Sequence, residues 1–234
     1  MPSLWPMRKQ DWAQLGSAVA LVGALASALQ HHRRRALVLV GLAVVGDAMG
    51  RRWSRADPRP LPYSLRWSLA FPHPAGVLRR ALEPQVGERI LEIGPGLGQH
   101  AVQVAQSVGA EGTVDVLDVQ QEMLDATVRR AERHGLHNVV PSKADASGRL
   151  SYEDSSFDAA YLMGVLGEVP DREGTLAELR RVLKPEGRLV VGEVAMDPDF
   201  IPPGRLRTMA ENAGFQLERR FGPPFAYEVR FVPS

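Results

Sequence analysis

The sequence contains no cysteine and very little lysine. Its 234 residues include only three lysines, Lys9, Lys143 and Lys184. The missing cysteine excludes structural disulfides, zinc sites built on thiolates and a thiol nucleophile. Six histidines are scattered without the spacing of metal ligands. We therefore expect no metal site.

The chain also lacks a strong net charge. Its 28 basic and 27 acidic residues give a formal charge of +1. This balance gives no electrostatic signal for a nucleic-acid partner, and we expect none. The length suits one α/β domain with a further segment attached.

Two stretches near the start of the sequence are almost free of charge. No charged residue occurs from Trp12 to Leu29, and Asp47 is the only one from Ala36 to Gly50. The first stretch has 18 residues, which is at the short end of what spans a bilayer. Small residues recur at every fourth position, as in closely packed helices: Gly16, Ala20, Ala24 and Ala28 in the first stretch, Gly46 and Gly50 in the second.

Three interpretations of residues 1–50 stay open. We favour a membrane anchor through residues 12–50, as a helical hairpin or as one span with an interfacial helix. A cleaved signal peptide and a buried pair of soluble helices are the alternatives. Basic residues on both outer flanks favour both ends in the cytoplasm, although three arginines between the stretches oppose this. We expect the cell membrane as the location, with the remaining chain facing the cytoplasm; a soluble cytoplasmic protein is the alternative.

Residues 51–76 are predicted to be a linker. Five prolines forbid a long helix here. Trp53, Tyr63, Trp67 and Phe71 alternate with arginines, a mixture that suits a lipid headgroup interface or packing on a globular domain. A short helix from Ala75 to Leu82 should lead into that domain, over residues 77–234.

Strand and helix patterns alternate through residues 77–234. Apolar strands are expected at 89–94, 113–118, 138–145, 156–163 and 187–193, helices at 98–109, 120–135, 171–187 and 202–214, and a final strand pair at 215–221 and 225–232. This order predicts an α/β fold with a doubly wound, mostly parallel seven-stranded sheet. Ligands of such sheets bind beyond the carboxyl ends of the strands.

The first strand ends in a glycine-rich turn, ILEIGPGLGQH at residues 90–100. Glycines in such a turn let the backbone approach a ligand closely. Gly94, Gly96 and Gly98 give the spacing GxGxG, and residue 99 is Gln. A dinucleotide fingerprint places its third glycine at that position. The spacing therefore disfavours an NAD-dependent oxidoreductase.

This turn and four later motifs resemble the class I S-adenosylmethionine-dependent methyltransferases, in particular the group that includes quinone-biosynthesis enzymes. The later motifs are VLDVQQEML, KADA, SFDAAYLMGVLGEVPD and LAELRRVLKPEGRLVVGE, in the family's order. The resemblance runs from about Arg80 to the C-terminus. It implies a Rossmann-like fold, S-adenosyl-L-methionine as cofactor and S-adenosyl-L-homocysteine as product.

The resemblance also implies roles for single residues in cofactor binding. Asp118 accepts the ribose hydroxyls, Val119 lies on the adenine, and Asp145 and Ala146 meet the adenine edge. Glu92, Gly94 and Gly96 meet the methionine end, and Gly98 and Met163 complete the expected cofactor-binding residues. Each acid has an alternative role as a solvated loop carboxylate or a helix cap. Asp115, inside the second strand, is expected on an exposed strand face.

Methyl transfer needs a base only when the attacking atom carries a proton. The family often has a histidine at the position of Gly167, so that imidazole is missing here. Glu168 and His100 are the candidates for a catalytic role, with Tyr227 weaker.

The expected acceptor is a small or membrane-associated lipophilic molecule, such as a lipid headgroup or a quinone-like ring. A catalytically silent, membrane-tethered scaffold or sensor that binds S-adenosylmethionine is the alternative. The oligomeric state stays open.

Overall fold

The computed structural model describes all residues except 1–12, 14–15, 18, 23, 25–32 and 57–74. Most of the first apolar stretch and most of the linker, with Tyr63, Trp67 and Phe71, thus lie outside the described residues. The chain divides into two compact units, Met1–Arg59 and Pro60–Ser234. Each unit is described by itself.

The first unit contains α2 (Arg33–Ala56), which includes the second apolar stretch. The described residues of the first stretch are helical as well. Gly46 lies against that helix, because a Cβ there would meet Ser17 Oγ at 2.6 Å. Ser17, Ala24 and Ala43 are buried. The two apolar stretches therefore pack together through small side chains.

A transmembrane segment is not supported. Within the described parts of the chain, no helix combines the length and the apolar character that crossing a bilayer demands. The physical reason lies in α2 itself. Asp47 and Arg51 pair at 2.7 Å within it, and arginines stand at both of its ends. Its uninterrupted apolar part is thus shorter than the roughly 20 residues of a span.

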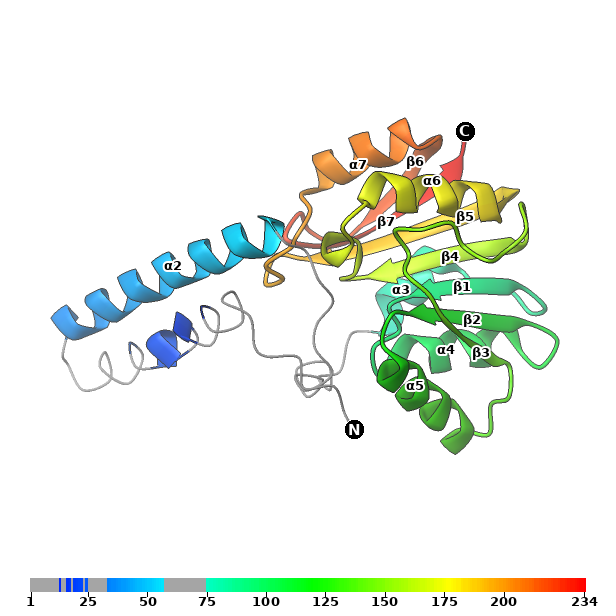
Figure 1. Ribbon diagram of the computed structural model, residues 1–234, viewed down its shortest axis with the longest axis horizontal. Coiled ribbons are helices and arrows are strands. Elements are labelled where there is room, and N and C mark those ends of the chain that lie inside the picture. Colours follow the sequence, from blue (N-terminus) through cyan, green and yellow to red (C-terminus); the bar gives the residue numbers. More distant parts are fainter. Residues whose placement is uncertain (1–12, 14–15, 18, 23, 25–32, 57–74) are drawn as a thin grey trace. The chain divides into compact units, whose positions relative to one another are not determined.

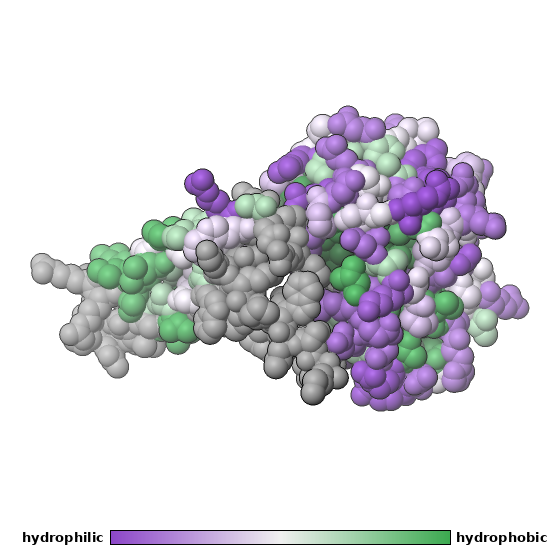
Figure 2. Space-filling view, viewed as in Figure 1, coloured by the Kyte–Doolittle hydropathy of each residue, from purple (hydrophilic) through white to green (hydrophobic). Residues whose placement is uncertain are grey.

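The first unit nevertheless exposes many large apolar side chains. Those on described residues are Val19, Leu21, Val22, Leu37, Val38, Val40, Leu42, Val44, Val45 and Met49. Figure 2 shows hydrophobic patches over α2. We call these ten residues the apolar surface of the first unit. Large exposed apolar patches of this kind mark sites of interaction with proteins or membranes.

The second unit begins with α3 (Ala75–Leu82) and then alternates strand and helix (Figure 1). The elements are β1 (Arg89–Ile93), α4 (Gln99–Val108), β2 (Thr113–Asp118), α5 (Gln121–Arg133), β3 (Val139–Lys143), β4 (Phe157–Met163), η2 (Leu166–Glu168), α6 (Arg172–Val182), β5 (Leu183–Val194), α7 (Pro203–Asn212), β6 (Phe215–Phe221) and β7 (Ala226–Pro233).

The strands form one seven-stranded sheet in the order β3-β2-β1-β4-β5-β7-β6. All pairs from β3 to β5 are parallel, while β7 is antiparallel to both β5 and β6. The predicted doubly wound, mostly parallel fold is confirmed. The strand order reverses at β1, next to β4, which is where ligands of such sheets bind.

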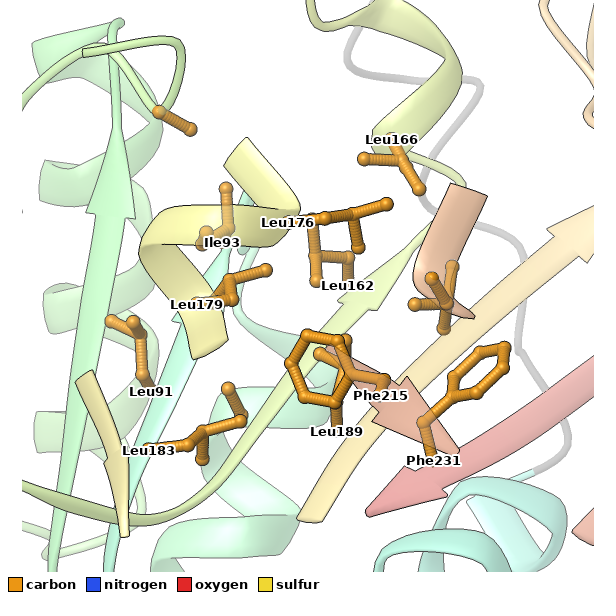
Figure 3. Packing of buried hydrophobic residues seen from close by; sticks show 14 of the residues in the cluster. Leu91, Ile93, Leu162, Leu166, Leu176, Leu179, Leu183, Leu189, Phe215 and Phe231 are labelled. Carbon is orange, nitrogen blue, oxygen red and sulfur yellow. The ribbon is translucent and has the colours of Figure 1, made fainter. Parts of the chain in front are cut away.

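Each face of the sheet has its own hydrophobic core. Buried residues of α3, α4 and α5 cover one face together with Ile90, Val116 and Tyr161. Leucines of α6 cover the other face, where Leu176 and Leu179 lie over Leu162 (Figure 3). The period-two alternation of the strands thus divides their side chains between the two helical layers.

Two expectations need correction. The helix expected at 171–187 ends at Val182, and Leu183 already pairs with Phe157 of β4. The register between the two strands then shifts between Phe157 and Ala159. Pro185 cannot continue a helix, which agrees with the end of α6 before it. Asp115 is buried, at 4% exposure, and pairs with Arg89 at 2.9 Å. The opposite charge makes a buried acid tolerable in this strand.

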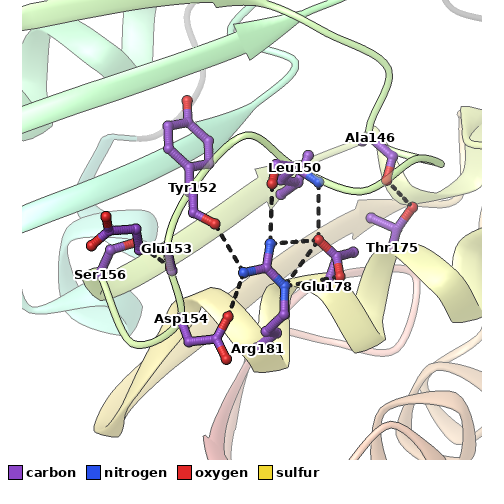
Figure 4. A network of polar contacts seen from close by, with 9 residues as sticks. All are labelled: Ala146, Leu150, Tyr152, Glu153, Asp154, Ser156, Thr175, Glu178 and Arg181. Carbon is purple, nitrogen blue, oxygen red and sulfur yellow. Dashed lines mark hydrogen bonds and ion pairs between the residues drawn. The ribbon is translucent and has the colours of Figure 1, made fainter.

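A polar network holds the connection between β3 and β4 against α6 (Figure 4). Arg181 donates to the carbonyl oxygens of Leu150 and Tyr152 at 3.1 and 2.9 Å. It also pairs with Asp154 and Glu178, both at 2.7 Å. The residues that Arg181 holds lead into Phe157, the first residue of β4, so the network fixes the start of that strand, at the edge opposite to the carboxyl ends.

Candidate active site

The predicted cofactor residues meet at the carboxyl edge of three neighbouring strands. Ile93 of β1 pairs with Leu117 of β2 and with Leu162 of β4. Gly94, Asp118 and Met163 follow these three residues in the sequence. The sheet register thus brings together side chains that are far apart along the chain.

The turn after β1 takes a conformation that favours glycine. Gly94, Gly96 and Gly98 have φ values of 70°, 56° and 73°, and residues other than glycine rarely adopt such values. A Cβ at Gly94 would lie 2.5 Å from Val165, and one at Gly98 would lie 2.8 Å from the Thr127 Cα. The bare backbone therefore fits between the loop after β4 and α5.

The turn leads directly into the N-terminus of α4. Gly98 is its N-cap, and no side chain caps the helix. The first amide groups of an uncapped helix attract anions, which suits the carboxylate of a methionine tail. His100 lies in this first turn and is partly exposed.

Glu92 is the most deeply buried acid at this edge, with 2% exposure. Among the described residues, no group bonds its Oε2. The pKa of Glu92 is raised to about 8, chiefly by burial; the neighbouring Tyr161 hydroxyl opposes this rise, and the charge of Asp118 adds to it. An unsatisfied buried carboxylate is costly. A cationic ligand beside it would remove much of that cost.

Asp118 ends β2 on the same face, two residues beyond the register partner of Glu92. Its Oδ1 accepts the Gln120 amide at 2.8 Å. Burial raises the pKa of Asp118 to about 6. Val119 follows with 39% exposure, so a flat apolar group can rest on it. This arrangement suits a ribose bonded by Asp118 and an adenine against Val119.

The loop after β3 lies next to Asp118. The Ala144 amide donates to the Asp118 carbonyl at 3.2 Å. Ala146 is buried, and its carbonyl accepts Thr175 Oγ1 at 2.9 Å. Asp145 is exposed and bonds the Ser147 amide at 2.8 Å. Ala146 is thus firmly positioned, whereas Asp145 caps its own turn in this structure.

The loop after β4 holds Glu168 in η2, partly exposed. Arg172 anchors this loop by donating to the Gly167 carbonyl at 2.5 Å. A Cβ at Gly167 would collide with the Asp199 backbone, so the histidine common in the resembling family has no room here. Tyr227 is buried, and its hydroxyl donates to the Ile201 carbonyl at 2.5 Å. That hydroxyl is therefore engaged away from the glycine turn.

Two further acids near this edge did not emerge from the sequence patterns. Glu193 of β5 is 5% exposed and accepts the Ile201 amide at 3.1 Å. Glu228 of β7 faces Met163 across Gly192. Tyr227, Val229 and Phe231 alternate as buried apolar residues along β7. This alternation is a sequence signal that could have placed Glu228 on the other face of the sheet.

The comparisons with known proteins agree with this geometry. Residues 90–187 match the family model described as a methyltransferase domain. A demethylmenaquinone methyltransferase of Lactobacillus johnsonii is 32% identical over 50% of this chain and 48% of its own length. The chain spans about half the length of that relative, and 42% and 34% of two other curated relatives.

Solved structures share the fold. An S-adenosylmethionine-dependent methyltransferase from Aquifex aeolicus has a TM-score of 0.66 and 22% identity, over 75% of this chain and 100% of that chain. The [4+2]-cyclase SpnF has a TM-score of 0.57 and 27% identity, over 63% and 57%.

Fold and site together define the class. The second unit has the Rossmann-like methyltransferase fold, and residues 90–187 match a methyltransferase domain. The residues present fit S-adenosylmethionine as cofactor, because the glycine turn, the uncapped α4 and the unpartnered Glu92 oxygen match its zwitterionic, cationic end.

Proposed function

We propose that this protein transfers a methyl group from S-adenosylmethionine to a small or membrane-associated lipophilic acceptor. The observation that carries the proposal is the buried Glu92 beside Asp118, at the edge where the glycine turn begins. The donor supplies an activated methyl group on a positive sulfur. Glu92 and Asp118 hold and orient its two ends, so that alignment and exclusion of water provide most of the rate.

The proposed acceptor is quinone-like or a lipid headgroup. The name of the Lactobacillus johnsonii relative, demethylmenaquinone methyltransferase, supports the first of these. The relative matches only half of each chain, so the acceptor is part of the proposal. A lipophilic acceptor also agrees with the apolar surface of the first unit.

We further propose that the protein works at the cytoplasmic surface of the cell membrane. The ten exposed apolar residues of the first unit support this location. Arginines at both ends of α2 suit anionic headgroups. This proposal replaces a crossing helix with helices that lie in the interface.

Calorimetric titration of the full chain tests the donor. We expect saturable binding of S-adenosylmethionine and S-adenosylhomocysteine, and none of NAD. Incubation with labelled S-adenosylmethionine and a membrane lipid extract then tests transfer. Absence of binding by both adenosyl ligands would refute the proposed function.

Sedimentation with vesicles tests the location. We expect the full chain to bind vesicles containing anionic lipid, and a variant with Leu37, Leu42 and Val45 changed to serine to bind much less. These three side chains are exposed, so the fold should persist, which circular dichroism checks. Equal binding by both proteins would contradict the location.

A catalytically silent binder of S-adenosylmethionine is the second candidate. The likeness to SpnF, which is a [4+2]-cyclase at 27% identity, shows that this fold also serves other reactions. Binding of both adenosyl ligands without any transfer to lipid extract or soluble metabolites would favour this candidate.

A further inference from the structure

One row of residues crosses the sheet at its carboxyl edge. Met163 of β4 pairs with Gly192 of β5, and Gly192 pairs with Glu228 of β7. On the other side, Gly94 and Asp118 follow the paired residues of β1 and β2. Adjacent strands are about 4.8 Å apart. The row thus joins the donor residue Asp118 to Glu228, four strand steps away.

Met163 and Glu228 share one face of the sheet. A Cβ at Gly192 would lie 2.6 Å from Met163 Sδ and 3.3 Å from Glu228 Cγ. Both side chains therefore lean over Gly192 from opposite sides. Because β5 contributes no side chain at this point, the Met163 thioether and the Glu228 methylene lie directly over its backbone. Such a surface suits an aromatic ring.

Glu228 has a buried carboxyl oxygen that no described residue satisfies. Its side chain as a whole is partly buried, and this oxygen is Oε2. The next residue on this face, Arg230, is occupied by Glu83 at 2.9 Å. Phe221 of β6 is the other strand neighbour of Glu228. Burial raises the pKa of Glu228 to about 7, and the charge of Arg80 on α3 opposes this.

The row also sets the available space. A donor with its ribose at Asp118 reaches over β1 toward β4. Glu228 lies two strand steps beyond Met163, or about 10 Å. The side chains of Met163 and Glu228 cover the backbone of Gly192 in this interval, so an acceptor ring would rest on the Met163 thioether beside the Glu228 carboxylate.

We propose that Glu228 is the catalytic base for an aromatic hydroxyl acceptor, with Met163, which covers Gly192, as the floor beneath its ring. This inference rests on the proposed function and specifies its acceptor class. Oε2 takes the hydroxyl proton. The electron pair left behind forms the bond to the methyl carbon, from the oxygen or from the ring carbon beside it, while the electrons of the carbon–sulfur bond stay on sulfur.

The charges balance in both cases. A carboxylate, a neutral acceptor and a cationic donor give a carboxylic acid, a methylated product and a neutral thioether. When the ring carbon attacks, its hydrogen is afterwards lost to water, and the proton held by Glu228 restores the hydroxyl.

The test uses the full chain, labelled S-adenosylmethionine and two probes, 2-naphthol and reduced 1,4-naphthoquinone. Glu228→Gln should bind S-adenosylhomocysteine within about twofold of the unchanged protein. Its rate of methyl transfer should fall at least about 100-fold, the usual contribution of a general base. The acid limb of the rate profile near pH 7 should vanish in Glu228→Gln and persist in Glu228→Asp.

Glu218→Gln is the matched control, since Glu218 is an exposed acid of β6 that pairs with Arg230 on the adjacent strand. We expect its rate and pH profile to be unchanged. A Glu228→Gln variant that keeps the rate and the acid limb would overturn the assignment.

A binding measurement keeps the proposal testable without turnover. Quenching of 2-naphthol fluorescence on the protein saturated with S-adenosylhomocysteine should be saturable, and at least about tenfold weaker in Glu228→Leu. Equal affinity in that variant, or no binding by the unchanged protein, would overturn the acceptor site. Failure to bind S-adenosylhomocysteine at all would instead refute the proposed function.

Discussion

Single buried acids at the carboxyl edge lower the stability of the protein, and the fold alone does not explain why they are there. Glu92, Asp118 and Glu228 are carboxyl groups whose pKa values burial raises to about 8, 6 and 7. Burying an acid without a partner destabilises a protein. Groups held in advance beside the place where a cation binds need no rearrangement when it arrives. The cost in stability is therefore consistent with a site for a positively charged donor.

Asp118→Asn tests this at the residue that meets the ribose. The amide loses the charge that strengthens two hydrogen bonds, each worth about 1.5–3 kcal/mol. We expect the affinity for S-adenosylhomocysteine to fall about 10- to 100-fold by calorimetry. Asp125→Asn, on the exposed side of α5, should leave it unchanged. An Asp118→Asn variant with full affinity would contradict the cofactor pose.

The sequence predicted the site residues unevenly. Asp118 and the three glycines follow directly from a strand end and a turn, which are local features. Glu228 was missed because its partners, Gly192 and Met163, are defined only by the register between strands. Asp115 was misplaced for the same reason, since its partner Arg89 is on the adjacent strand.

At the scale of elements, the turn between β1 and α4 is held by close packing against α5. Gly98→Ala should destabilise the protein by about 2–4 kcal/mol. The left-handed backbone costs about 1–2 kcal/mol, and the new Cβ would lie 2.8 Å from the Thr127 Cα, which forces the helix to shift. Urea unfolding measures the change.

Gly135→Ala is the matched control for this turn. Gly135 has a φ of 71°, close to the 73° of Gly98, but nothing lies within 4 Å of its Cβ position. It should cost only the backbone strain, about 1–2 kcal/mol. Equal losses in the two variants would show that packing against α5 contributes nothing.

Elements were more predictable than their ends and contacts. The order of strands and helices in the second unit follows from hydrophobic periods, and the sheet confirms it. The end of α6 at Val182 was missed because Leu183 extends the apolar helical period, while pairing with Phe157 is a tertiary effect.

On the scale of the whole molecule, the four acids with raised pKa values act together. They are Glu92, Asp118, Glu193 and Glu228, at about 8, 6, 8 and 7. Their pKa values in the unfolded chain are near 4. Between the unfolded and the folded pKa values, the folded state binds more protons than the unfolded state. The free energy of unfolding therefore falls as pH rises through this range.

Acids with lowered pKa values do not reverse this trend. Ion pairs and hydrogen bonds lower the pKa of Asp158 and Glu178, and the stability that they add is complete above about pH 5. We therefore expect the melting temperature of the ligand-free protein to decrease between pH 5 and pH 8, by calorimetry.

We expect the affinity for S-adenosylmethionine to depend on pH in the opposite direction to the stability of the ligand-free protein. The positive charge of this donor favours the ionised forms of Glu92 and Asp118, so its affinity should rise with pH from 5 to 8, and with it the gain in melting temperature. Glu92→Gln, which cannot ionise, should flatten both slopes. If the unchanged protein and Glu92→Gln showed the same pH dependence with and without ligand, Glu92 would not be the acid that senses the donor.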